Sequence, residues 1–391
     1  MRAGYGTSAN FPFEYPIAAT LNIDTQSFIR NGGYIISNTS GSVLGNPNLK
    51  PERIDEIEFG VEGRFFNNRL RMDLSIYNKK TNDLIISRPL DPSTGYTSTQ
   101  TNIGLIENKG VELDLSMDWI QSDDGINFST SLNWSTNDAI VIDLGEDTDR
   151  IVYAGFGTLG NAAIPGESLG SIIGSSITRV GATIENSRWV GGDGGLAVNN
   201  QGSYDETFDP TIIGDANPDW IANISNSLSY KNLSLNFLFN FQAGGDIYST
   251  TVATLLGRGL TTDTLDRELS FILPGVNNGQ PNNKQINNST FYFSNVLYGP
   301  DEMRMYDASH WRLGEVSISY SLPKSLIDNT PFGNISITAS GFNLFYDAIN
   351  MPDGTNFDPN IAGVGVGNGR GFDFLNGPSA KRYGASVKLT F

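Results

Sequence analysis

The sequence NPNLKPE at residues 46–52 comes directly before the first long run of alternating residues in the chain. Two prolines and two asparagines disfavour regular secondary structure, so a loop is expected to end here and a strand to begin. From Ile57 the apolar residues fall on every second position, through Phe59 to Val61, with glycine or glutamate between them. This period of two predicts a β-strand whose two faces meet different surroundings.

The same alternation recurs along the chain and predicts an antiparallel, all-β fold. From Val111 to Trp119 every second residue is apolar, and each residue between them is hydrophilic. Tight turns such as Asn67-Asn68 separate some strands, whereas long loops rich in glycine or polar residues fill 141–216 and 244–305. The expected strands cover residues 2–7, 53–65, 70–76, 111–119, 126–136, 220–230, 233–241, 311–322, 334–345 and 383–391.

Long and short connections alternate along the chain, so the two ends of the expected sheet differ. Outer-membrane β-barrels have short periplasmic turns and long outer loops. We therefore expect roughly 10–12 strands of a transmembrane β-barrel with long extracellular loops, each strand about ten residues long. The direction of the strands leaves residues 141–216 with either no spanning strand or two.

Composition excludes several classes of protein. The 391 residues include 44 glycines, 11% aromatic and 17% charged residues, which favours a β-rich chain. A net charge of −17 argues against a nucleic-acid partner. With no cysteine and one histidine, His310, we expect no metal site, no cofactor and no enzyme activity. No run of about 18 apolar residues predicts a transmembrane helix.

A soluble β-sandwich or a secreted β-helix would also show alternation and glycine-rich turns. The polar faces here consist almost entirely of Ser, Asn, Asp and Glu, which suits a water-filled lumen, and Trp and Tyr end the apolar faces as in an interfacial girdle. We therefore expect the apolar faces to contact lipid. The side chains expected there are Val111, Leu113, Leu115, Met117, Leu233, Leu235, Phe237 and Phe239.

Several motifs resemble those of the SusC/RagA-type branch of the TonB-dependent outer-membrane transporters, and they occur in that branch's order. Besides residues 46–52, they are Asn102–Gly104, Glu107–Leu113, Pro165–Ser171, Ile213–Trp220, Phe241–Tyr248, Ala308–Leu313, Tyr320–Leu326 and Gly341–Phe345. The resemblance covers essentially all of residues 1–391. It implies the C-terminal part of a barrel of about 22 strands, with no plug domain on this chain.

That resemblance implies energy-coupled import of a nutrient, an oligosaccharide or a peptide, across the outer membrane of a Gram-negative, Bacteroidota-like cell. The implied partners are a SusD-like surface lipoprotein as a lid, the TonB complex acting through a plug outside this chain, the N-terminal half of the barrel, the barrel-assembly machinery and outer-membrane lipid. The alternative is a barrel that does not transport and serves as a binding or scaffold subunit of a larger cell-envelope complex.

Two groups of residues are candidate functional sites. Aromatic faces stack on sugar rings or peptide side chains, so we expect ligand binding in the longest loop, at Trp189, Asp193 and Tyr204. Loop packing is the other interpretation of these aromatic residues. The last strand resembles the signal by which outer-membrane barrels are recognised for assembly, carried here by Tyr383, Val387, Leu389 and Phe391.

Overall fold

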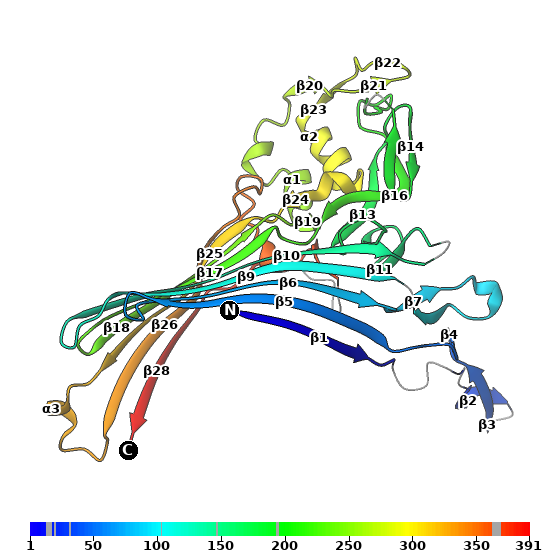
Figure 1. The fold of residues 1–391 in the computed structure, drawn as a ribbon. Helices are drawn as coiled ribbons and strands as arrows, with labels where there is room; N and C mark the ends of the chain where they lie inside the picture. The colour runs from blue at the N-terminus through cyan, green and yellow to red at the C-terminus, as the bar shows by residue number, and fades with distance from the viewer. Residues whose placement is uncertain are drawn as a thin grey trace.

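The computed structural model of the chain describes residues 1–12, 18, 21–30, 33–102, 104–145, 148–192, 195–361 and 369–391. Its main feature is a ten-stranded antiparallel sheet that curves like a segment of a barrel wall, with long loops at one end (Figure 1). In order across the sheet, the strands are β1 (Arg2–Asn10), β5 (Glu52–Phe65), β6 (Leu70–Asn82), β9 (Leu105–Ile120), β10 (Ile126–Asp143), β17 (Trp220–Tyr230), β18 (Leu233–Ala243), β25 (His310–Ser321), β26 (Asn334–Asp347) and β28 (Arg382–Thr390). The predicted all-β, antiparallel barrel fold is confirmed, and the sheet is open between β1 and β28.

Short turns connect the strands at the end of the sheet where the C-terminus also lies (Figure 1). The turn after β5 has φ angles of 53° at Asn67 and 67° at Asn68, in a left-handed region that asparagine tolerates better than most residues. Connections at the opposite end are long. Because β10 pairs directly with β17, the described residues between them add no strand to the wall, which settles the question that the loop lengths left open.

Strand register places the apolar residues of neighbouring strands side by side on one face. One such row runs through Val61, Leu74, Leu113, Trp134, Ala222, Phe241 and Trp311. The next row, on the other face, runs through Glu62, Asp73, Asp114, Asn133, Asn223, Asn240 and Arg312. A slip of one residue would exchange the two faces of a strand, so this pattern specifies the register. All the side chains expected to contact lipid share the apolar face.

Two polar side chains on the apolar face, Thr130 and Asn226, are hydrogen-bonded to each other. Near the loops this face is aromatic, with the rings of Trp311 and Phe345 centred 5.0 Å apart. Farther along it, Thr130 Oγ1 donates to Asn226 Oδ1 (2.8 Å) and accepts from Trp119 Nε1 (3.0 Å). On a surface without water, polar groups need this kind of internal partner.

The long connections fold into a lobe, which we define as the described parts of residues 144–219, 244–309 and 348–381. One lobe sheet has the order β11 (Ile151–Gly155), β12 (Gly160–Ala163), β13 (Ser171–Ile177) and β16 (Glu206–Asp215), and another has the order β24 (Met305–Asp307), β19 (Asp246–Ser249) and β27 (Phe372–Asp373). Further lobe elements are the hairpin of β14 (Ala182–Glu185) and β15 (Arg188–Gly191), the pairs β20 (Ser270–Ile272) with β23 (Gln285–Asn287) and β21 (Val276–Asn277) with β22 (Gln280–Pro281), and the helices α1 (Thr250–Gly257) and α2 (Asn288–Phe291).

Two earlier loops contain the hairpin of β2 (Leu21–Arg30) and β3 (Gly33–Ser40) and a sheet of β4 (Val43–Leu44), β8 (Ser98–Asn102) and β7 (Ile85–Pro89).

Most of the buried apolar side chains gather in this lobe. One cluster joins α1 to the helical segment η3 (Tyr292–Leu297) and includes Val252, Leu256 and Val296. A second cluster fastens the lobe to the wall at β10, through Val141, Leu144, Ile151 and Ala163. No helix in the described part of the chain is long and apolar enough to cross a membrane.

Introducing a charge on the apolar face tests the orientation of the wall. We expect Phe237→Arg, in the full-length protein that carries this chain, to destabilise the folded barrel by about 2–4 kcal/mol if the site lies near the bilayer midplane. The neighbouring Asn236→Arg, on the polar face, is the matched control and should change stability little. The measurement is the urea midpoint of each variant in lipid vesicles. Equal midpoints for the two variants would contradict the assignment of faces.

Candidate functional site

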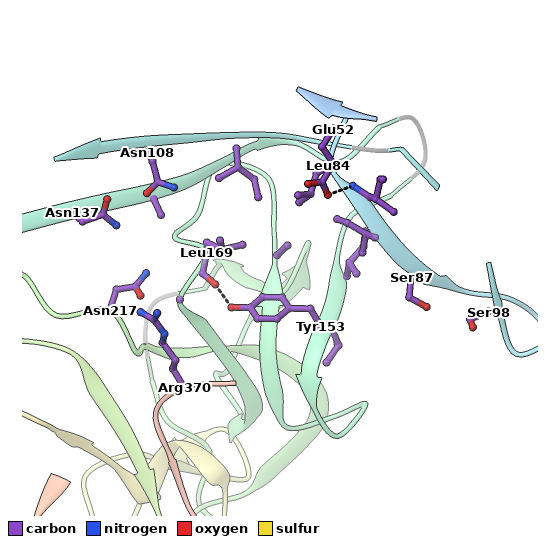
Figure 2. A pocket seen from close by; sticks show the side chains of 18 of the residues that line it. Glu52, Leu84, Ser87, Ser98, Asn108, Asn137, Tyr153, Leu169, Asn217 and Arg370 are labelled. Atoms are coloured by element: carbon purple, nitrogen blue, oxygen red, sulfur yellow. Dashed lines mark hydrogen bonds between the residues drawn. The ribbon is translucent and has the colours of Figure 1, made fainter. Parts of the chain in front are cut away.

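A pocket of about 990 Å³ lies where the lobe meets the polar face of the wall, at the loop end of the sheet (Figure 2). We call it the mouth pocket. The wall strands β9 and β10 contribute Asn108 and Asn137, the lobe strand β11 contributes Tyr153, and Arg370 approaches from the lobe segment before β27. Small-molecule sites commonly hold about 300–1,000 Å³, so the mouth pocket is large enough for a ligand of several residues or rings.

Two polar groups in the mouth pocket are already paired. Both oxygens of the buried Glu52 carboxylate accept hydrogen bonds, Oε1 from the Ile85 amide (2.7 Å) and Oε2 from Asn10 Nδ2 (3.1 Å). Tyr153 donates its hydroxyl to the Leu169 carbonyl. Burial raises the pKa of Tyr153 to about 12, so its phenol stays protonated and acts as a donor.

Other polar groups around the pocket remain free for a ligand. Neither the side-chain amide of Asn108 nor the Arg370 guanidinium has a hydrogen bond or an ion pair with a residue that the structure describes. Asn217 uses its Nδ2 to donate to Ser168 Oγ (3.0 Å), which leaves its Oδ1 as an acceptor. The mouth pocket therefore offers amide donors and acceptors together with a cationic group.

The stretch at residues 46–52 holds one rim of the pocket in place. The Lys50 amide donates to Asn102 Oδ1 (2.6 Å), and Asn102 Nδ2 donates to the Lys50 carbonyl (2.7 Å). Asn46 Nδ2 donates to the Gln100 carbonyl on β8 (2.9 Å). Together with the hydrogen bond from the Ile85 amide to Glu52, these bonds keep β7 and β8 beside the wall.

Three of the motifs found in the sequence meet where the lobe joins β17 and β18, and we call this junction the attachment node. The motifs are Pro165–Ser171, Ile213–Trp220 and Phe241–Tyr248. Within the node the Asp215 amide donates to Asp246 Oδ2 (2.9 Å). The motifs therefore have a structural role, because they carry the contacts that fix the lobe to the wall.

Two glycines allow the close approach of segments in the attachment node. A Cβ atom on Gly170 would lie 2.3 Å from Asp215 Oδ1, and one on Gly244 would lie 2.5 Å from Asp219 Oδ2. Gly244 also has a φ of 71°, which favours glycine over residues with a side chain. Any larger residue would push these segments apart and disturb the pocket beside them.

The two longest loops are also bonded to each other. Within the 3₁₀ turn η4 (Asp301–Arg304), Asp301 Oδ2 accepts from both the amide and the hydroxyl of Ser175 (3.1 Å each). Next to it, Glu302 Oε2 accepts from the Ile177 amide (3.0 Å). Because Ser175 and Ile177 lie on β13, the second long loop is held against the sheet of the first.

The residues predicted to bind ligand do not line the mouth pocket. Trp189 lies on β15, where Nε1 donates to Ser176 Oγ (3.2 Å) and the Arg179 guanidinium carbon lies 5.7 Å from the ring centroid. Tyr204 is half-buried, and its backbone amide is bonded to η3. Asp193 lies outside the described residues, as does Ile103 of the motif Asn102–Gly104. Ligand binding by Trp189, Asp193 and Tyr204 stays a prediction.

The predicted assembly signal occupies the last strand of the sheet. On β28 the side chains of Tyr383, Val387 and Leu389 are exposed on the apolar face. The ring of Phe391 is also exposed and lies 5.0 Å from that of Phe332, measured between centroids. This geometry places the residues in one apolar row at an open edge, and their recognition during assembly stays a prediction.

His310 has a backbone partner at the start of β25. The side chain is buried, and its Nδ1 lies 2.8 Å from the Ala308 carbonyl oxygen. In the described part of the chain, no group of three or more His, Asp or Glu residues is arranged to hold a metal ion.

The pocket brings together residues from segments far apart in the sequence, which is why sequence reasoning did not find it. Five of its lining residues nevertheless belong to the motifs noted above: Glu52, Asn108, Leu169, Gly170 and Asn217. These residues could therefore have been proposed as site residues because they lie in the motifs. Tyr153 and Arg370 carry no such signal.

Comparison with protein families gives a match to the first part of the chain. Residues 1–172 match the model of the family described as "TonB dependent receptor-like, beta-barrel". Among curated proteins, the chain is 27% identical over 414 residues to TonB-dependent receptor P3 of Formosa agariphila, covering 100% of this chain and 39% of the relative. It is 24% identical over 214 residues to TonB-dependent receptor SusC of Bacteroides thetaiotaomicron, covering 54% of this chain and 21% of the relative.

Solved structures support the same fold. The structure described as "Structure of the RagAB peptide transporter" superposes with a TM-score of 0.70 at 22% sequence identity, covering 100% of this chain and 40% of that chain. The chain therefore spans about 40% of the length of the proteins it resembles over its whole extent.

The attachment node predicts that the lobe is more stable at mildly acidic pH. The pKa of Asp246 is raised, first by burial and then by the carboxylates of Asp307, Asp215 and Asp219. The folded protein therefore holds a proton that the unfolded chain releases, so stability falls as pH rises from about 4 through the raised pKa. Hydrogen exchange of the lobe amides in the full-length protein should become faster over this range.

The variant Asp246→Asn keeps an oxygen for the Asp215 amide and removes the charge. We expect this variant to lose the pH dependence of lobe exchange. Asp209→Asn, at an exposed carboxylate on β16, is the control and should retain it. An unchanged pH profile in Asp246→Asn would contradict the assigned role of this residue.

Proposed function

This chain belongs to the TonB-dependent receptor β-barrel family, and from that premise we propose that it forms part of the wall and outer mouth of a nutrient importer. Members of this family are receptors and transporters, not enzymes. The proposed location is the outer membrane of a Gram-negative, Bacteroidota-like cell. The solute would enter at the mouth pocket and pass along the polar face of the wall. The single observation that carries the proposal is the position of that pocket, at the loop end of the polar face.

A complete barrel is part of the proposal, because β1 and β28 each pair with only one strand among the described residues. In lipid, an open sheet edge leaves backbone amides and carbonyls without partners, at several kcal/mol each. We propose that the N-terminal half of the barrel supplies the strands that pair with these edges. The same half would connect to a plug domain and, through it, to the TonB complex that supplies energy.

A SusD-like lipoprotein lid is proposed for the outer surface of the lobe. The segments from α1 to η3 carry several exposed apolar side chains, and exposed apolar surface is typical of protein-binding sites. The residues are Leu260, Leu265, Leu269, Ile272, Phe293 and Tyr298. At the other end of the wall, we propose that the row from Tyr383 to Phe391 is recognised by the barrel-assembly machinery.

Uptake by cells tests the importer directly. We expect the wild-type full-length protein to support uptake of a radiolabelled mixture of peptides or of oligosaccharides, and a protonophore should abolish it. Asn108→Trp should reduce this uptake several-fold, because an indole would occupy the mouth pocket. Thr183→Trp, at an exposed position on β14, is the control for adding a tryptophan and should leave uptake unchanged.

The levels of folded barrel in the outer membrane must be equal among the variants for this comparison. Uptake of neither mixture by a correctly assembled barrel would overturn the importer proposal and favour a scaffold subunit of the cell envelope. Equal uptake by wild type and Asn108→Trp would instead show that solutes do not pass the mouth pocket.

A further inference from the structure

The mouth pocket lies between two strand edges that no other strand covers. β7 is the last strand of the sheet β4-β8-β7, and β11 is the first strand of the sheet β11-β12-β13-β16, in the part of the chain that the structure describes. Both strands line the pocket, β7 through Ile85, Ile86 and Ser87 and β11 through Ile151 to Tyr153. Open edges of this kind pair readily with an extended chain.

The open edge of β7 offers the backbone groups of Ser87 to a ligand. The Ile85 amide already donates to Glu52 Oε1 (2.7 Å), which shows that the backbone groups of Ile85 point away from β8. Residues two apart along a strand direct their backbone groups to the same side, so the Ser87 amide and carbonyl face the same open edge. Among the described residues, they have no backbone partner there.

Arg370 gives the pocket a site for an anionic ligand group. Its guanidinium is free of described partners, whereas the Glu52 carboxylate keeps its charge and is held by the Ile85 amide and the Asn10 side chain. A guanidinium binds a carboxylate through two parallel hydrogen bonds, which gives both strength and orientation. A chain with a free carboxylate at one end matches this arrangement.

The apolar lining favours a peptide over a sugar. Among the described lining residues Tyr153 is the one aromatic residue, and its hydroxyl is already bonded to Leu169. Sugar rings are commonly held by stacking on broad aromatic faces, and a single anchored tyrosine provides little such surface. The aliphatic side chains of Leu84, Ile86 and Ile106 offer contacts that suit the side chains of a peptide.

We propose that the mouth pocket binds a short extended peptide, which adds a strand to the open edge of β7 and places its terminal carboxylate at Arg370. Main-chain hydrogen bonds would supply affinity for many sequences, and the carboxylate would set the orientation. This inference rests on the proposed function, because it names the class of nutrient that enters at this pocket.

Calorimetric titration of the purified full-length protein tests the proposal with defined probes. The probes are one synthetic hexapeptide of alanine, valine and leucine with a free terminal carboxylate, the same peptide as its terminal amide, the same peptide with methyl groups on alternate backbone nitrogens, and maltohexaose. The free acid should bind, the amide and the N-methylated peptide should each bind about tenfold or more weakly, and maltohexaose should not bind.

Variants separate the two parts of the site. Arg370→Gln should bind the acid and the amide equally, whereas Arg64→Gln, at an exposed arginine near the turn end of the wall, should still prefer the acid. Ser87→Pro removes the free donor on the open edge of β7, so the unmodified free acid should bind this variant about tenfold more weakly than the wild-type protein. Circular dichroism and heat modifiability check that each variant is folded.

Equal binding of acid and amide by the wild-type protein would overturn the carboxylate assignment, and binding of maltohexaose without the peptide would overturn the peptide assignment. If no solute is taken up by energised cells, the importer proposal fails, whereas the titration on purified protein still decides whether the pocket binds peptides.

Discussion

Backbone hydrogen bonding in a medium without water is the constraint on which the rest of this structure depends. Each wall strand must pair with neighbours, and the pairing fixes alternate side chains on opposite faces of one sheet. Residues such as Val61 and Glu62 are adjacent in the chain, but they belong to rows that meet different surroundings. The polar pair Thr130 and Asn226 shows the same constraint, because these two side chains on the apolar face are hydrogen-bonded to each other.

This arrangement moves the hydrophobic core out of the wall and into the lobe. The outward apolar face leaves the wall with a polar interior surface, so the loops must bury their own apolar side chains to fold. They do so around Val252 and Leu256, and again where Val141 meets the lobe. The mouth pocket lies at the boundary of these two regions, where amides of the wall face strand edges of the lobe.

The sequence predicts the wall far better than the site. Alternation follows the two different surroundings of a strand, so it predicts the wall strands β5, β17, β18, β25, β26 and β28 within about two residues of their observed bounds. The strands β6, β9 and β10 extend farther toward the loops than the alternation predicts. The loops follow contacts between distant segments, such as Glu52 with Ile85 or Asp215 with Asp246, and no local period reports these contacts. The sequence motifs contain the residues of the attachment node, but they do not predict that these residues connect the lobe to the wall. Aromatic character predicts ligand binding at Trp189, and the bond of its indole to Ser176 could not be inferred from the sequence.

The most direct test of the central claim is the accessibility of spin labels along β18 in the full-length protein in lipid. The claim is that one face of this wall contacts lipid and the other an aqueous interior that leads to the mouth pocket. Nitroxides at Leu235, Phe237 and Phe239 should be relaxed by oxygen, and those at Ser234, Asn236 and Asn240 by a water-soluble nickel complex. The opposite alternation, or none, would contradict the account.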